Sequence, residues 1–116
     1  MKIEGTVIRG QQLGRKLGFP TANIDAEGLS VENGVYASTV EFDGRRYRAM
    51  SNVGIRPSVD GRQRLLETYI FDFEGDLYDR TLSVELLQKI RDERKFSSVA
   101  ELKERLHIDA DHIRNL

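Results

Sequence analysis

The sequence predicts an all-β domain, a closed or partly closed antiparallel barrel followed by a C-terminal α-helix. Through about the first ninety residues, apolar and polar side chains alternate with the period of two that is typical of strands, and glycines interrupt the alternation. After Lys95 the period of the apolar residues changes to that of a helix. Short strands leave unpaired edges, and closure into a barrel removes them, so the pattern favours a barrel over an open sheet.

The first three expected strands include a hairpin. Residues 2–9 form the first strand, and residues 34–42 form the second, with odd-numbered side chains on one face and even-numbered side chains on the other. Asp43 and Gly44 follow as a tight turn, because glycine accepts the positive φ that such turns require. Residues 45–53 are the expected partner strand.

Two more β-rich runs, residues 63–73 and 81–90, are expected to form a second hairpin. Glu74, Gly75 and Asp76 between them are residues that favour turns. These runs bring the count to five strands, and a sixth can be drawn.

The C-terminal helix is expected to begin after Ser98. Val99, Leu102 and Leu106 recur at helical spacing, and Ser98 with Glu101 fits a capping box. We also expect the helix to restart at Asp109.

Composition narrows the class of protein. A chain of 116 residues predicts one domain over residues 1–116. Cysteine is absent, which excludes disulfides and makes a cytoplasmic setting natural. No apolar run approaches the roughly 20 residues that span a bilayer, so we expect a soluble protein without a membrane partner. A formal net charge of −1 lacks the cationic field of a nucleic-acid binder.

One segment fits neither period and predicts a functional loop. Residues 10–23 read GQQLGRKLGFPTAN, with three glycines, two cations and Pro20. Close backbone N–H groups beside positive charge suit a phosphate chain. The stretch matches neither the P-loop nor the dinucleotide fingerprint. The alternative is a surface loop whose glycines only allow turns.

Ordered motifs along the whole chain resemble those of the riboflavin kinase family, in particular the C-terminal kinase domain of bacterial bifunctional riboflavin kinase/FAD synthetases. This resemblance implies a six-stranded antiparallel barrel of Greek-key type with a C-terminal α-helix. It also implies transfer of the γ-phosphate of ATP to riboflavin, giving FMN and ADP. The motifs are GxVxxG at 5–10, GRKLGFPTAN at 14–23, GVY at 34–36, NVGxRP at 52–57, ETYIFDFEGDLY at 67–78, and Arg91, Glu93, Lys95 and Phe96 in IRDERKF.

The resemblance implies that Thr21 and Asn23 place Mg²⁺ and the phosphates of ATP, with Zn²⁺ or Mn²⁺ as other possible cations. Oxygen ligands suit this hard cation, which is typically shared with substrate phosphates. An ordinary turn after Pro20 is the alternative for both residues. Positions that the resemblance places against the nucleotide are Gly10, Arg15, Ile70, Asp72 and Tyr78. Barrel packing is the alternative for Ile70 and Tyr78.

Glu67 lies in an otherwise apolar strand, LLETYIF, where a buried carboxylate is costly unless it has a task. The resemblance implies that it is the catalytic base, which accepts the proton of the riboflavin 5′-hydroxyl. Strand alternation alone does not say which face is buried, so a solvent-facing Glu67 is the alternative.

Arg91, Arg94 and Phe96 match the positions that hold the flavin in the family, where an aromatic ring and guanidinium planes stack on the isoalloxazine. The alternative is a solvated connector between strand and helix. The chain departs from the family at Tyr69, where histidine is common, and at Asp79, which replaces a glycine and must adopt the backbone geometry that the glycine allowed.

Two further readings stay open at this point. The chain is expected to be a monomer, either a stand-alone kinase or a module excised from a bifunctional enzyme. A barrel that binds flavin or nucleotide without turnover is the non-enzymatic alternative. A metal site at His107 and His112 is not favoured, because residues five apart do not share a helix face.

Overall fold

Six strands form one antiparallel sheet in the computed structural model, which describes residues 1–8, 21–58, 61–73, 75 and 77–116. The strand order across the sheet is β1-β6-β3-β4-β5-β2. The strands are β1 (Lys2–Thr6), β2 (Thr21–Asp25), β3 (Gly34–Phe42), β4 (Arg45–Ser58), β5 (Gly61–Ile70) and β6 (Thr81–Arg91).

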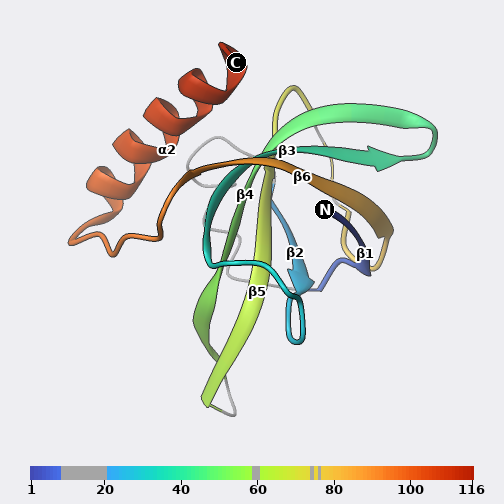
Figure 1. Ribbon diagram of the computed structural model, residues 1–116, viewed down its shortest axis with the longest axis horizontal. Helices are drawn as coiled ribbons and strands as arrows, with labels where there is room; N and C mark the ends of the chain where they lie inside the picture. Colours follow the sequence, from blue (N-terminus) through green and yellow to red (C-terminus); the bar gives the residue numbers. More distant parts are fainter. Residues whose placement is uncertain (9–20, 59–60, 74, 76) are drawn as a thin grey trace.

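The sheet curls until its two edge strands approach each other (Figure 1). The backbone N–H of Ile8, after β1, donates to the carbonyl of Asn23 on β2 at 2.7 Å, which forms a bridge between the two edges. Gly5 makes the approach possible, because a Cβ there would lie 2.4 Å from Cγ2 of Ile24. The expected antiparallel barrel with a C-terminal helix is confirmed.

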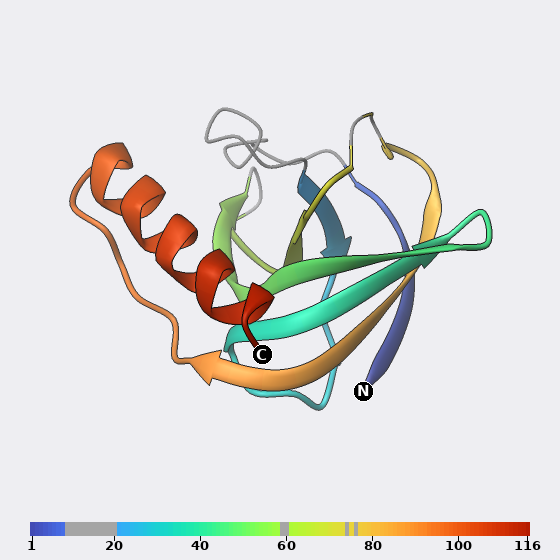
Figure 2. The same ribbon diagram turned by 90° about the horizontal axis from the view of Figure 1, so that it is seen from above.

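Alternation along the strands creates two hydrophobic layers. One fills the interior of the barrel, and the other lies between the outer face of the sheet and the helix. Figure 2 shows the helix beside the curled sheet. Strand β3 contributes Tyr36 and Val40 to the interior and Val35 and Ala37 to the outer layer, as its alternation predicted. The outer layer consists of Val35, Ala37, Met50, Tyr69, Phe71, Leu106, Ala110 and Ile113.

Helix α2 (Val99–Arg114) begins at the predicted cap. The Ser98 hydroxyl accepts the backbone N–H of Glu101 at 3.1 Å, whereas the Glu101 carboxylate accepts from the Ser97 hydroxyl at 2.7 Å. The expected restart at Asp109 is wrong, because the helix is continuous and Asp109 is buried against Arg91. No helix in the described part of the chain is both long and apolar enough to span a membrane.

The C-terminal half of α2 is fastened to the sheet by two arginines. Arg48 on β4 donates to the carbonyl of Ile113 at 2.6 Å and to that of Arg114 at 3.2 Å. The Arg114 guanidinium lies 4.6 Å from the ring centre of Phe71. The two hydrogen bonds from Arg48 give further donors to carbonyls of the last helical turn, where intrahelical partners run out.

Two expectations about the strands are wrong. Thr21–Asp25 forms a strand, although residues up to Asn23 were expected in an irregular loop. The expected second hairpin does not exist either, because β5 pairs with β4 and β2, whereas β6 pairs with β3 and β1. Just before β6, the backbone N–H of Asp79 donates to the carbonyl of Val7, which follows β1, at 3.1 Å. The hairpin was predicted from turn-forming residues alone, and such residues do not determine which strand pairs with the next one.

Candidate active site

A row of polar side chains crosses the outer face of three neighbouring strands. Asn23 on β2 lies directly opposite Glu67 on β5, and Glu67 lies directly opposite Asn52 on β4. Directly opposed residues point to the same face with Cβ atoms about 5 Å apart. The adjacent row on this face consists of Thr21, Tyr69 and Met50.

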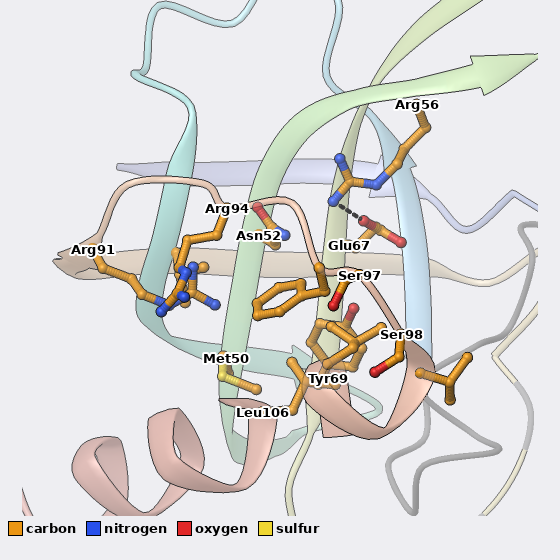
Figure 3. A pocket seen from close by; sticks show the side chains of 14 residues that line it. Met50, Asn52, Arg56, Glu67, Tyr69, Arg91, Arg94, Ser97, Ser98 and Leu106 are labelled. Atoms are coloured by element: carbon orange, nitrogen blue, oxygen red, sulfur yellow. Dashed lines mark ion pairs between the residues drawn. The ribbon is translucent and has the colours of Figure 1, made fainter. Parts of the chain in front are cut away.

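A pocket of about 420 Å³ lies over this face. Its other walls are the connector, which we define as residues 92–98 between β6 and α2, and the first turns of α2 (Figure 3). The residues around it are Val35, Met50, Asn52, Arg56, Glu67, Tyr69, Arg91, Arg94, Phe96, Ser97, Ser98, Val99, Leu102 and Leu106.

Glu67 faces this pocket, with 19% of its side chain exposed. Its Oε1 atom lies 2.7 Å from Nη2 of Arg56. Burial raises the pKa of the Glu67 carboxyl above its ordinary value, although the Arg56 guanidinium opposes that rise and Glu93 adds to it. Glu67 is therefore neither solvent-facing nor inside the barrel, and it lies under the connector beside a fixed cation.

Phe96 and two arginines form the opposite side of the pocket. The guanidinium carbons of Arg91 and Arg94 lie 5.9 and 5.5 Å from the ring centre of Phe96. Arg91 is held by Asp109, whose Oδ2 accepts from Nε at 2.9 Å. Figure 3 shows Arg91 and Arg94 on one side of the pocket and Glu67 on the other. A flat aromatic ligand would find stacking partners on the first side.

Asn23 is a candidate neutral ligand for a cation, as is Asn52 on the other side of Glu67, whose Oδ1 is also buried without a partner among the described residues. Asn23 is 3% exposed, and its Oδ1 finds no hydrogen-bond partner among the described residues. A buried oxygen without a partner costs about 1–3 kcal/mol, which a bound cation would recover. Thr21, two residues earlier on the same face, is half-buried. The oxygens of both residues fit the hard cation Mg²⁺. The described residues contain no cluster of three or more His, Asp or Glu suited to a metal.

Thr21 and Asn23 lie on the strand beside Glu67 but are not among the residues that line the pocket, and neither are Ile70, Asp72 and Tyr78. Ile70 is 1% exposed and packs in the barrel core. Asp72 and Tyr78 lie beyond the end of β5, where Tyr78 is 40% exposed. Gly10 and Arg15 lie outside the described residues.

Asp79 has φ 67°. This is the left-handed region that glycine adopts freely, and aspartate is among the residues that tolerate it.

Several residues of the pocket were not predicted to have a role. Asn52 and Arg56 belong to the NVGxRP motif, and their position in it was the available signal. Met50 and Leu106 form the apolar floor next to Tyr69, and no local pattern distinguishes them from ordinary core residues.

The sequence is similar to a family model and to curated proteins that are all described as riboflavin kinases. The family model for riboflavin kinase (flavokinase) matches residues 1–116. The bifunctional riboflavin kinase/FMN adenylyltransferase of Pseudomonas fluorescens is 42% identical over 99% of this chain, and that of Escherichia coli K12 is 41% identical over 92%. The RNA-binding riboflavin kinase RibR of Bacillus subtilis is 41% identical over 92%. The chain spans 38%, 35% and 47% of these relatives, respectively.

Solved structures share the fold. A structure described as a macrolide-efflux protein from Streptococcus pneumoniae matches with a TM-score of 0.84 at 38% identity, covering 99% of this chain and 38% of that one. Riboflavin kinase from Trypanosoma brucei matches with a TM-score of 0.67 at 23% identity, covering 98% of this chain and 74% of that one. With the family model matching from end to end, the chain belongs to the riboflavin kinase family.

Proposed function

We propose that this chain is an ATP-dependent riboflavin kinase, which transfers the γ-phosphate of ATP to the 5′-hydroxyl of riboflavin and gives FMN and ADP. One observation carries the proposal. A single pocket has a half-buried carboxylate, Glu67, on one side and an aromatic ring beside two arginines on the other, and Asn23, with an unpaired buried oxygen, lies opposite Glu67 on the neighbouring strand.

The pocket suits the acceptor in size and chemistry. Its volume of about 420 Å³ lies within the range of roughly 300–1,000 Å³ that is usual for small-molecule sites. The flat isoalloxazine would stack beside Phe96 and Arg94, with Arg91 at its edge. The ribityl chain would then extend across the pocket and bring its terminal hydroxyl to Glu67.

Glu67 would act as the general base. It takes the proton of the 5′-hydroxyl while that oxygen forms a bond to the γ-phosphorus, and the bond from this phosphorus to the bridging oxygen breaks to release ADP. Burial alone would favour the protonated carboxyl, and the Arg56 guanidinium at 2.7 Å favours the ionised form that a base requires. General-base assistance contributes about 10²–10⁴ in rate, and alignment and electrostatic stabilisation supply the rest.

Thr21 and Asn23 would hold Mg²⁺ beside Glu67, and Zn²⁺ or Mn²⁺ would suit the same oxygens. When bound, the cation neutralises charge on the phosphates of ATP. Both ligands are neutral, so they add no negative charge next to the triphosphate. Among the other nucleotide-contacting positions, Ile70 would act only through the barrel wall, since its side chain is buried in the core.

The cellular setting is part of the proposal. We propose a monomer that works in the cytoplasm on riboflavin and ATP, without a membrane or nucleic-acid partner. The cysteine-free composition and the formal net charge of −1 support this view. One relative is named as RNA-binding, and titration of this chain with RNA by gel shift tests whether the absence of a cationic field excludes such binding.

Incubation of the purified chain with riboflavin, ATP and Mg²⁺, followed by chromatography, tests the function. We expect FMN, and we expect Glu67→Gln to lower its rate of formation by about 10²–10⁴. Glu85→Gln, an exposed strand glutamate paired with Arg46, is the matched control and should keep full activity. Riboflavin binding without FMN formation would favour the non-catalytic binder. Full activity of Glu67→Gln would remove Glu67 as the base and leave the kinase in place.

A further inference from the structure

Arg56 connects the two sides of the candidate active site. Its Nη2 lies 2.7 Å from Oε1 of Glu67, and its Nη1 lies 2.9 Å from Oε1 of Glu93. The exposed fractions of the three side chains are 30%, 19% and 28%, so both ion pairs are partly shielded from solvent. Partly buried pairs are screened less by salt than surface pairs. The arginine fork suits this geometry, because it presents two donors to two carboxylates.

A second observation concerns Gly54, two residues before Arg56. A Cβ at this position would lie 2.0 Å from Oε1 of Glu93 and 2.5 Å from its Oε2. Gly54 is not among the glycines with positive φ, so its backbone does not require glycine. A side chain at position 54 would have to displace the Glu93 carboxylate. Strand β4 therefore provides a seat for Glu93 that is free because residue 54 has no Cβ.

Glu93 belongs to the connector that carries the flavin side of the pocket. Arg94 follows it immediately, and Phe96 comes three residues later. The contact of Glu93 with Gly54 and Arg56 therefore fixes this part of the connector against β4, next to the strand that carries Glu67.

We propose that Arg56 and Glu93 are positioning residues that couple the flavin side of the pocket to the base. Arg56 orients Glu67 toward the acceptor hydroxyl. Glu93, seated on Gly54, holds Arg56 and keeps the connector at the distance that the flavin requires. The proposal rests on the proposed kinase function for the role of Glu67, while the coupling itself is a property of the pocket and can be measured by binding.

Riboflavin binding measures the coupling without turnover. We expect Glu93→Gln and Arg56→Met each to weaken riboflavin binding about tenfold, because each releases the connector from β4. The double variant should bind no more weakly than either single variant, since both remove the same link. Quenching of riboflavin fluorescence on titration with each variant gives the dissociation constants. Losses that multiply to about a hundredfold in the double variant would overturn the coupling.

Turnover measures the orientation of the base. Arg56→Lys keeps the positive charge but loses the fork, so it cannot hold both carboxylates. We expect kcat to fall by about tenfold to a hundredfold at saturating riboflavin and ATP, because a small misplacement of a reacting group has effects of this size. An unchanged kcat in Arg56→Lys would overturn this role of Arg56.

Gly54→Ala is the independent test, because it changes neither ion-pairing side chain. It should displace Glu93 and reproduce the effect of Glu93→Gln on riboflavin binding. If Gly54→Ala left riboflavin binding unchanged, the proposed seat of Glu93 on Gly54 would be refuted.

Arg46→Gln is the matched control, since Arg46 makes a similar 2.9 Å pair with Glu85 away from the pocket, and it should alter neither measurement. Circular dichroism establishes that each variant is folded, and Arg56→Lys replaces Arg56→Met in the binding cycle if the latter unfolds. If the unmutated chain forms no FMN, the kinase proposal fails, whereas the binding cycle still decides the coupling.

Discussion

Removal of the Ser51 hydroxyl alone should destabilise the fold more than joint removal of the Ser51, Ser38 and Thr68 hydroxyls. Ser51 Oγ lies 2.8 Å from Ser38 Oγ and 2.8 Å from Thr68 Oγ1, which forms a chain of hydroxyls across β3, β4 and β5. All three side chains are at most 2% exposed. The chain joins the strands that carry the floor of the pocket, because Thr68 is the neighbour of Glu67 and Ser51 that of Asn52.

The magnitude follows from the partners that Ser51 serves. Ser51→Ala leaves the hydroxyls of Ser38 and Thr68 buried without their common partner. Each unsatisfied buried group costs about 1–3 kcal/mol, so for the two hydroxyls we expect the free energy of unfolding to fall by about 2–6 kcal/mol. That is a large part of the roughly 5–15 kcal/mol that stabilises a typical domain.

Urea denaturation followed by circular dichroism measures this loss. The triple variant Ser38→Ala, Ser51→Ala, Thr68→Val should be more stable than Ser51→Ala alone, because replacement of all partners by apolar groups leaves no hydroxyl unpaired. Thr6→Val is the control, since its exposed 3.4 Å contact with Thr81 should contribute less than about 0.5 kcal/mol. The reasoning would be refuted if Ser51→Ala were within about 0.5 kcal/mol of the unmutated protein. It would also be refuted if the triple variant were less stable than Ser51→Ala.

Three other changes test the two sides of the pocket and the helix. Asn23→Ala should impair the use of ATP and Mg²⁺ more than riboflavin binding, because it removes the unpaired oxygen that we propose as a cation ligand. Titrations of each ligand measure this, and equal losses would contradict the proposed role. Phe96→Ala should weaken riboflavin binding by about tenfold, measured by fluorescence quenching, with little change in the KM for ATP, because the aromatic face is lost. Ser98→Ala should lower the free energy of unfolding by about 1 kcal/mol in urea, because the N–H of Glu101 loses its acceptor, whereas Ser98→Asp should keep most of the stability.

Local patterns predicted the elements whose determinants are local. The bounds of β3 follow from alternation that ends at Asp43 and Gly44, whose φ values of 50° and 76° form the expected tight turn. The cap at Ser98 is likewise encoded within four residues. Strand β2 was missed because its five residues, TANID, follow a glycine-rich stretch and form a strand through pairing with β5, 40 to 48 positions away.

The candidate site depends even more on distant pairing. Motif resemblance selected Glu67, Asn23 and Phe96, but only the register of β2 against β5 shows that Asn23 and Glu67 are direct neighbours. The orientation of Glu67 could not be predicted, because both faces of β5 are largely buried, one in the barrel and one under the helix. Arg56 was not assigned a role because its two carboxylate partners lie 11 and 37 positions later in the sequence.

The candidate site combines residues on paired strands with residues on the irregular connector. Glu67, Asn23 and Asn52 stand on paired strands, whereas Arg94 and Phe96 stand on a segment without strand or helix structure between β6 and α2. A strand residue cannot be exchanged freely, because its backbone and neighbours belong to the ladder. Positions 94 and 96 do not belong to a strand ladder, so substitutions there disturb no ladder hydrogen bond. Under the proposed kinase function, variation at these two positions should therefore change the preference among flat alcohol acceptors, while Glu67, Asn23 and the Glu93 attachment stay as they are.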